Sequence, residues 1–329
     1  MHIPDNYLSP QTCAVMGAVM VPVWTVAVKK VKEELSPEKV PVIGILAAFS
    51  FLIMMFNIPL PGGTTGHAVG GTLVAILVGP WSACIAVTVA LLIQALFFGD
   101  GGILAFGANA FNMAFVLPFV GFYLFVLLKK IFKGNTGAYM SAFIASYAGL
   151  NLAAFATAVE FGIQPLFFKD IAGLPMYCPY ALNISIPAMM IPHLLAAGFV
   201  EAIATAGVYA YIAHVSPGII YGRNEPVKIP PLYALILIMA ALAPLGLLAA
   251  GTAWGEWGAD EIKRLTGYIP QAMGKGFSFN ALFPDYTVPG VKHDILAYII
   301  SALFGAAVLM VLFKLIAGLV TARAHRAKK

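Results

Sequence analysis

The sequence predicts an all-α membrane protein, a polytopic bundle of transmembrane helices, and three observations lead to that fold class. Of the 329 residues, 61% are hydrophobic and 10% are charged, whereas an ordinary soluble domain is about a quarter charged. Too little polar sequence remains to cover a water-soluble core. Long apolar segments recur along the chain, and basic residues gather in the short segments between them. We therefore expect lipid to surround most of the chain.

Nine apolar segments approach the length of roughly 20 residues that a helix needs to cross the hydrocarbon core. Seven form a first group and two follow near the C-terminus. They lie near residues 11–28, 40–60, 63–79, 80–98, 103–128, 138–160, 183–213, 229–250 and 294–320. The third is short and glycine-rich, so a re-entrant hairpin is the alternative to a full span at that point.

The basic residues predict how the chain crosses the membrane, because short loops rich in Lys and Arg stay on the cytoplasmic side. With nine crossings, all four basic clusters fall on one side. The N-terminus is then outside and inserted into the bundle, the C-terminus is cytoplasmic, and the protein is a multi-pass protein of the cell membrane. The clusters are Lys29, Lys30, Lys32 and Lys39; Lys129, Lys130 and Lys133; Arg223 and Lys228; and Arg323, Arg326, Lys328 and Lys329.

Several function classes find no support. The net charge of +5 comes without a basic stripe interleaved with aromatic residues, so no nucleic-acid partner is expected. Because the sequence has no Walker A loop, nucleophile elbow or HExxH motif, we expect a transport subunit and not an enzyme, with ATP hydrolysed by other chains. The three cysteines lack the CxxC spacing of a thiolate metal site, and no inverted internal repeat points to a self-contained secondary transporter.

A change in composition near residue 216 predicts two modules. Prolines cluster from Ser216 to Pro231, and proline ends helical segments. We expect a membrane domain over residues 1–215, a cytoplasmic linker over 216–228, and a two-span module over 229–329 with an external loop at 251–293.

The N-terminus offers a metal-chelating group. A signal peptide would carry positive charge before its apolar core, and Met1–Pro10 has none, so we expect the N-terminus to be retained. The α-amine of Met1, the backbone nitrogen of His2 and a His2 ring nitrogen can then close chelate rings on one metal. Planar nitrogen sites favour Ni(II) or Cu(II), with a fourth nitrogen still to be supplied. The alternative is that His2 is only an exposed terminal residue.

His67 is the candidate fourth ligand. It lies in GGTTGHAVGG, where five glycines in ten residues allow another segment to approach the backbone closely. In a helical third span, His67 would lie about 6 Å below the outer end, on the same face of the membrane as His2. Ionisable residues within spans are costly and commonly functional. The alternative is a hydrogen-bonded histidine in a packed interior.

Other polar residues are candidate partners of the ligands or of one another. Metal-bound histidines commonly pass their second ring nitrogen to a hydrogen-bond acceptor, although asparagines also hydrogen-bond between packed spans. The candidates around the ligands are Asn109, Asn112, Thr64 and Thr65. His193 and Glu201 share a helical face, which predicts a structural pair or a proton path. Trp254 and Trp257 with nearby Glu256, Asp260 and Glu261 are typical of an interfacial aromatic belt with a soluble surface. The alternative is an initial metal-attracting patch.

Together, the segments MHIPDNYLSP, GGTTGHAVGG and GANAFNMAF resemble the NikM/CbiM family, the substrate-capture components of energy-coupling-factor transporters for nickel and cobalt. The resemblance covers roughly residues 1–215, while WGEWGADEI and PDYTVPG resemble a fused NikN/CbiN accessory component. It implies that Met1, His2 and His67 coordinate the metal. It also implies a transmembrane coupling component similar to NikQ or CbiQ and ATPase subunits similar to NikO or CbiO. The sequence departs from the family at Asn6, where glycine is frequent.

Three functions remain open. The first is the substrate-binding subunit of an ATP-driven Ni(II) uptake transporter, with no organic cofactor. The second is a Co(II)-specific subunit feeding cobalamin synthesis, since both branches share the His2 and His67 pattern. The third is a proton-coupled secondary carrier using Glu201 and His193, which would move solute without partner chains. A planar four-nitrogen site favours nickel.

Overall fold

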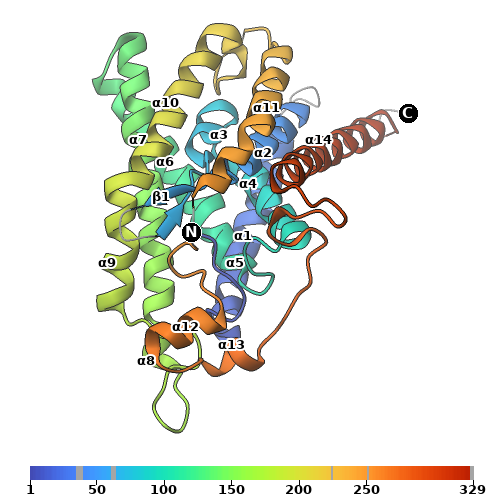
Figure 1. Ribbon diagram of the computed structural model, residues 1–329. Helices are drawn as coiled ribbons and strands as arrows, with labels where there is room; N and C mark the ends of the chain where they lie inside the picture. Colours follow the sequence, from blue (N-terminus) through green and yellow to red (C-terminus); the bar gives the residue numbers. More distant parts are fainter. Residues whose placement is uncertain (35–39, 61–63, 224, 250–251, 327–329) are drawn as a thin grey trace.

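The computed structural model describes residues 1–34, 40–60, 64–223, 225–249 and 252–326. Four residues used to predict the spans and their orientation lie outside these ranges: Lys39, Gly63, Lys328 and Lys329. The described residues form an almost entirely helical protein (Figure 1). The predicted fold class is confirmed.

The helices run through the chain in the order that the apolar segments predict. The π-helical segments η3 and η4 join α5 to α6 and α9 to α10, and the π-helical segment η2 extends α4, so that each group continues as one long helix. The elements are α1 (Pro10–Glu34), α2 (Val40–Met54), α3 (Gly71–Val78), α4 (Pro80–Ile93), η2 (Gln94–Phe98), α5 (Phe106–Asn109), η3 (Ala110–Val116), α6 (Leu117–Ile131), α7 (Gly134–Gly162), α8 (Gln164–Phe167), α9 (Leu182–Pro192), η4 (His193–Ala197), α10 (Gly198–Val215), α11 (Pro230–Leu242), α12 (Ala259–Thr266), α13 (Gln271–Lys275) and α14 (Asp294–Arg326).

Within the described residues, seven helical stretches are long and apolar enough to cross a membrane. They correspond to seven of the nine predicted spans. The second predicted span, 40–60, becomes the shorter apolar helix α2. Which side of the membrane each terminus occupies stays a prediction.

The third predicted span, 63–79, is wrong as a transmembrane helix. Its first part forms a strand, β2 (Thr64–Gly66), which pairs antiparallel with β1 (Ile58–Leu60). Only the eight residues Gly71–Val78 form the helix α3, which spans about 12 Å at the rise of an α-helix. Gly70 breaks the helix, since its φ of 73° lies in the left-handed region. His67 therefore lies in the loop between β2 and α3, and not in the first turn of a helix.

The short α3 still returns the chain toward the end of the molecule where α10 finishes. The backbone N–H of Tyr221, which follows α10, donates to the carbonyl of Ile76 in α3 at 3.2 Å. The C-terminal half of α3 therefore lies beside the segment that follows α10.

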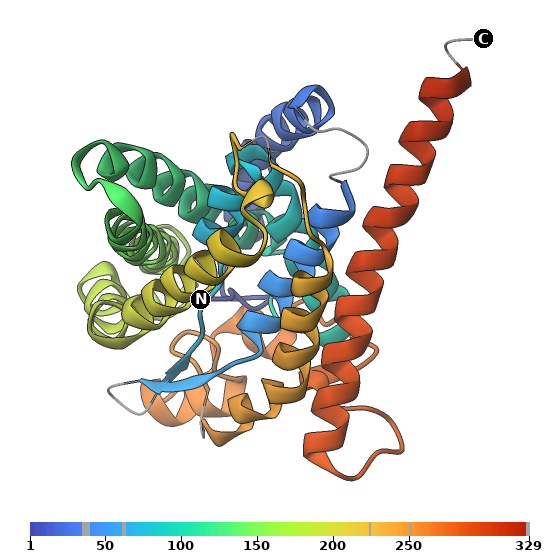
Figure 2. The ribbon, with the colours of Figure 1, turned by 90° about the horizontal axis from the view of Figure 1, so that it is seen from above.

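The C-terminal helices pack against the first group of helices. Gly44 of α2 faces Phe313 of α14, and Gly305 of α14 faces Phe51 of α2, so a small residue on each helix admits an aromatic ring of the other. Figure 2 shows α14 along one edge of the bundle and the N-terminus near its centre. Residues 252–293, within the predicted external loop, contain α12 and α13 and contact the N-terminal segment through Asn6 and Tyr7.

Candidate metal centre

The first residues of the chain are buried inside the protein. Met1 is 4% exposed, His2 3% and Ile3 0%. The side chain of Asn109 in α5 makes two hydrogen bonds to the backbone of Ile3. Its Oδ1 accepts from the Ile3 N–H at 2.7 Å, and its Nδ2 donates to the Ile3 carbonyl at 3.0 Å. Gly102 donates to the same carbonyl at 2.8 Å. Both polar groups of the Ile3 backbone are therefore held, which fixes the position of His2 immediately before it.

Residues 5 to 7 are anchored in the same manner. The Asp5 carboxylate accepts the backbone N–H groups of Ile103 at 3.1 Å and Leu104 at 2.7 Å. Asn6 has a φ of 70°, in the left-handed region that asparagine tolerates better than most residues. The Tyr7 hydroxyl donates to the carbonyl of Trp257 at 2.6 Å. The N-terminal segment, residues 1–9, is thus a fixed part of the fold.

The two histidines predicted from the sequence meet. His67, 6% exposed, places Nε2 at 3.2 Å from Nδ1 of His2. His67 Nδ1 lies 3.0 Å from the carbonyl oxygen of Ala68. Since a carbonyl oxygen only accepts, His67 Nδ1 carries the proton and Nε2 presents a lone pair toward His2.

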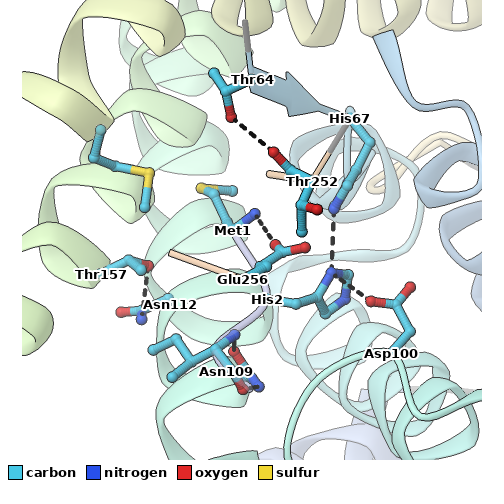
Figure 3. Close-up of polar contacts among 12 residues, drawn as sticks. Met1, His2, Thr64, His67, Asp100, Asn109, Asn112, Thr157, Thr252 and Glu256 are labelled. Atoms are coloured by element: carbon cyan, nitrogen blue, oxygen red, sulfur yellow. Dashed lines mark hydrogen bonds and ion pairs between the residues drawn. The ribbon is translucent and has the colours of Figure 1, made fainter. Parts of the chain in front are cut away.

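Two carboxylates complete the surroundings of the N-terminus (Figure 3). Glu256 Oε1 lies 3.4 Å from the α-amine of Met1, and Asp100 Oδ1 lies 3.2 Å from His2 Nδ1. Tyr286 donates its hydroxyl to the other oxygen of Asp100 at 2.6 Å, and Gln94 donates to that oxygen at 3.2 Å. Glu256 and Tyr286 belong to the C-terminal part of the chain, which therefore contributes side chains around the buried N-terminus.

Burial sets the protonation of these groups. It lowers the pKa of His2 to about 3, aided by the neighbouring positive α-amine, while an interaction with Gln94 acts in the opposite direction. Burial also raises the pKa of Asp100 and of Glu256, and the positive amine counteracts both rises. The Glu256 side chain keeps 24% exposure, so water limits the rise of its pKa. His2 is consequently neutral at physiological pH, as a metal ligand must be.

These groups line a cavity of about 410 Å³. Its wall combines the N-terminal segment, the loop before α3, the turn after α4 and the C-terminal part of the chain. The lining residues are His2, Pro4, Asn57, Thr65, His67, Gly99, Asp100, Gly101, Gly246, Leu247, Ala249, Thr252, Ala253, Glu256, Asp285, Tyr286 and Tyr298. The cavity gives a dication room beside both histidines and three carboxylates.

The geometry suits a nitrogen-rich metal site. Two nitrogen ligands about 2.0 Å from one metal and at right angles lie ~2.8 Å apart, close to the 3.2 Å between His67 Nε2 and His2 Nδ1. Among the described residues, no three His, Cys, Asp or Glu side chains gather closely enough to hold a metal. The buried amine of Met1 and the backbone nitrogen of His2 adjoin the His2 side chain in the sequence and could supply the remaining nitrogens.

The other predicted partners of the ligands have different contacts. Asn109 holds the Ile3 backbone and not a histidine ring. Asn112 donates to Thr157 at 3.1 Å and to Glu160 at 2.8 Å, apart from the two histidines (Figure 3). The two predicted threonines lie in β2. Thr64 donates to the carbonyl of Thr252 at 3.4 Å, and Thr65 lines the cavity that contains both histidines.

His193 and Glu201 do not pair with each other in this structure. His193 Nδ1 contacts the carbonyl of Met189 at 2.7 Å, one turn earlier. Glu201 accepts the backbone N–H groups of Val69 and Gly70. The shared helical face predicted that Glu201 pairs with His193. In the structure the loop before α3 supplies the partners of Glu201.

Sequence reasoning missed the roles of Asp100, Tyr286 and Gln94 and described Glu256 only as part of a diffuse acidic patch. Asp100 lies between the predicted spans 80–98 and 103–128, a position that the nine predicted crossings put on the same side as His2 and loop 251–293, and this shared side is the available signal. The contacts themselves join residues up to 255 positions apart, and no local pattern specifies such pairs.

Residues 2–219 match the family model described as the cobalt uptake substrate-specific transmembrane region, and residues 231–322 match the PDGLE domain. The chain belongs to the cobalt-uptake substrate-specific transmembrane family.

Relatives in this family cover nearly the whole chain. The probable fused nickel transport protein LarMN of Lactiplantibacillus plantarum is 49% identical over 95% of this chain and 97% of its own length. The fused nickel transport protein NikMN of Rhodobacter capsulatus is 46% identical over 97% and 98%. A crystal structure described as a truncated transition metal transporter has 57% identity and a TM-score of 0.61, covering 64% of this chain and 98% of the other.

Proposed function

We propose that this chain is the substrate-binding membrane subunit of an ATP-driven nickel uptake transporter. It captures Ni(II) through four nitrogens: the Met1 amine, the His2 backbone and ring nitrogens, and His67 Nε2. The observation that carries the proposal is the 3.2 Å approach of the two histidines beside a buried N-terminus. The names of the two full-length relatives, both called nickel transport proteins, support the choice of metal.

The charges around the cavity support capture of a cation. Asp100, Glu256 and Asp285 line it, and carboxylates in a cleft raise the local concentration of a dication. Binding requires the Met1 ammonium and the His2 amide each to release a proton, and the Nδ1 proton of His2 to move to Nε2. His2 Nε2 and Gln94 Oε1 are both buried without a hydrogen-bond partner among the described residues, so the Gln94 side chain is a candidate acceptor for that proton, in the way that metal-bound histidines are commonly oriented.

A cobalt-specific subunit feeding cobalamin synthesis is the second candidate. It is favoured by the family description and by a cobalt transport protein of Geobacter sulfurreducens that is 29% identical over 79% of this chain. Planar nitrogen sites favour Ni(II), so competition between the two metals for the purified protein separates the candidates.

Transport through this subunit depends on partners: a transmembrane coupling component and cytoplasmic ATPase subunits. The chain has no phosphate-binding loop of its own. A proton-coupled secondary carrier loses support because the carboxylate of Glu201 and the Nδ1 of His193 are each occupied by backbone groups. The carrier hypothesis requires that the reconstituted chain alone move metal down a gradient.

Calorimetric titration of the purified protein with Ni(II) tests the capture site. We expect His67→Ala to weaken binding by more than about 100-fold, the upper range for residues that only support a ligand. His293→Ala is the matched control, since His293 is exposed and far along the chain in the loop before α14. Equal affinity of His67→Ala and the wild-type protein would contradict the proposed ligand set.

A further inference from the structure

Glu201 is a completely buried carboxylate in the first turn of α10, within the continuous helical stretch Leu182–Val215, at 0% exposure. A buried charge or acid needs strong hydrogen-bond partners, because burial without them is costly. Its partners are backbone groups of the loop before α3. Oε2 accepts the N–H of Val69 at 2.7 Å, and Gly70 donates to both oxygens at 3.1 and 3.0 Å. The carboxylate thus fastens a loop that begins at His67.

The peptide group between Ala68 and Val69 joins this carboxylate to the metal centre. Its N–H end is held by Glu201, and its C=O end accepts the proton of His67 Nδ1 at 3.0 Å. A trans peptide is planar, with its N–H and C=O pointing in opposite directions. Holding the N–H therefore also sets the direction of the carbonyl.

The direction of that carbonyl decides which nitrogen of His67 faces His2. With the Ala68 carbonyl on Nδ1, the proton stays there, and Nε2 carries the lone pair 3.2 Å from His2 Nδ1. A hydrogen bond at each end of one peptide group also polarises the group and strengthens both bonds. The loss of one end consequently weakens the other.

We propose that Glu201 is a positioning residue of the metal centre: it holds the Ala68–Val69 peptide so that the carbonyl fixes the tautomer and direction of His67. The proposal rests on the proposed function of His67 as a ligand. Ser50 of α2 donates to the carbonyl of Val69 at 2.8 Å, and Gly70 packs its α-carbon against Phe49. The loop is therefore held by contacts from both α2 and α10. Glu201 is the only one of these contact residues with an ionisable side chain.

A simpler role for Glu201 would be to cap the N-terminus of α3, since a carboxylate is favourable there. That role predicts lower stability in a variant but no specific change in His67. The two roles are separated by measurements on the His67 ring itself and on the metal bound to it.

The first test is the tautomer of His67 in the metal-free protein, read from nitrogen NMR shifts of labelled histidine and assigned with His67→Ala. The wild-type protein should show His67 protonated on Nδ1. Glu201→Gln, which keeps the volume and one acceptor oxygen, should shift His67 toward a mixture of tautomers. A wild-type His67 protonated on Nε2, or a tautomer unchanged in Glu201→Gln, would overturn the proposal.

The second test is calorimetric titration with Ni(II) of Glu201→Gln, Thr205→Val and His67→Ala. Thr205 is the matched control: it lies one turn further along α10, is 1% exposed, and its hydroxyl makes no hydrogen bond among the described residues. We expect Glu201→Gln to weaken binding by about 10- to 100-fold, with an altered absorption spectrum of the bound metal, and Thr205→Val to leave both unchanged.

These titrations separate failure of His67 as a ligand from failure of Glu201 as a positioning residue. If His67→Ala binds Ni(II) as the wild-type protein does, the proposed function fails. If His67→Ala loses binding while Glu201→Gln keeps it, only the role of Glu201 fails. Equal weakening in Glu201→Gln and Thr205→Val would mean that polar packing within α10, and not the clamped peptide, accounts for the effect.

Discussion

At the scale of single residues, His2 is held between a ligand and a carboxylate. Its Nδ1 lies 3.2 Å from both His67 Nε2 and Asp100 Oδ1. The single proton on His2 Nδ1 can make a well-aligned hydrogen bond to only one of these two acceptor atoms. A metal bound to Nδ1 would replace both contacts. Asp100 therefore helps to orient the His2 ring, and its carboxylate adds negative charge beside the position of a bound metal.

Asp100→Asn tests that role. The amide keeps the size of the side chain but removes the negative charge beside His2, so we expect Ni(II) affinity to fall by about 10-fold. Asp285→Asn is the control, because Asp285 lines the same cavity and lies at a left-handed φ of 52° that asparagine also tolerates. Calorimetric titration measures both variants. A larger loss in Asp285→Asn than in Asp100→Asn would show that charge in the cavity matters more than contact with His2.

The lowered pKa of His2 predicts a pH dependence of stability. Unfolded histidine titrates near 6.5, whereas folded His2 titrates near 3, so the unfolded state binds more protons between these values. The contribution of His2 is fully present above pH 6.5 and is lost as the pH falls toward 3. The raised pKa values of Asp100 and Glu256 act with the opposite sign.

The contribution of His2 is isolated by comparing variants. Thermal unfolding of the metal-free protein in detergent, from pH 7.5 to 4.5, should show a steeper loss of stability for the wild-type protein than for His2→Asn. Parallel curves for the two proteins would mean that His2 is not buried in its neutral form.

At the scale of elements, the N-terminal segment is positioned by glycines that it touches. A Cβ on Gly102 would lie 2.5 Å from the backbone nitrogen of Asp5 and 2.8 Å from the carbonyl carbon of Pro4. Because backbone atoms cannot give way as a flexible side chain can, the segment carrying the amine and His2 would have to shift.

Gly102→Ala should therefore weaken Ni(II) binding, although Gly102 provides no ligand. A misplaced ligand set should cost at least about 10-fold in affinity. Gly17→Ala is the matched control, since a Cβ there meets nothing within 4 Å. Titration of both variants checks this, and normal binding by Gly102→Ala would argue that the N-terminal segment tolerates displacement.

The elements also explain where the sequence could and could not predict the structure. Long uniform apolar segments such as 80–98 specify their own helices, and the structure has them with nearly the same bounds. The segment 63–79 is equally apolar in part, but Gly66 and Gly70 allow a strand and a left-handed turn. Hydropathy averages over a window, whereas the fold here depends on the conformation of individual glycines.

At the scale of the whole molecule, the C-terminal part of the chain covers the N-terminal segment. The Asn6 side chain donates to the carbonyl of Phe277 at 2.8 Å and accepts its N–H at 3.0 Å. Glu256 and Tyr286 reach the metal centre from the same part. The sequence predicted which residues of the first module meet, because both histidines lie in short distinctive segments. It could not predict this cover, since the orientation of loop 251–293 depends on tertiary contacts.

Asn6→Gly tests the cover. Glycine adopts the left-handed φ freely but loses both hydrogen bonds to Phe277, whereas Asn6→Ala loses them and adds strain of roughly 1 kcal/mol. Hydrogen exchange of Phe277 and its neighbours should therefore be slowest in the wild-type protein, faster in Asn6→Gly and at least as fast in Asn6→Ala. Unchanged exchange in both variants would show that these two hydrogen bonds do not hold the C-terminal part in place.

The most direct test of an N-terminal nickel site leaves every side chain intact. Protein released by cleavage immediately before Met1 is compared with protein that keeps Gly-Ser ahead of Met1, and a third sample carries the same two residues after Lys329. The added residues move the α-amine away from its place beside Glu256. We expect the Ni(II) absorption band typical of a planar nitrogen site, and tight binding, in the first and third samples and neither in the second. Equal binding and an equal band in all three samples would contradict an N-terminal chelate.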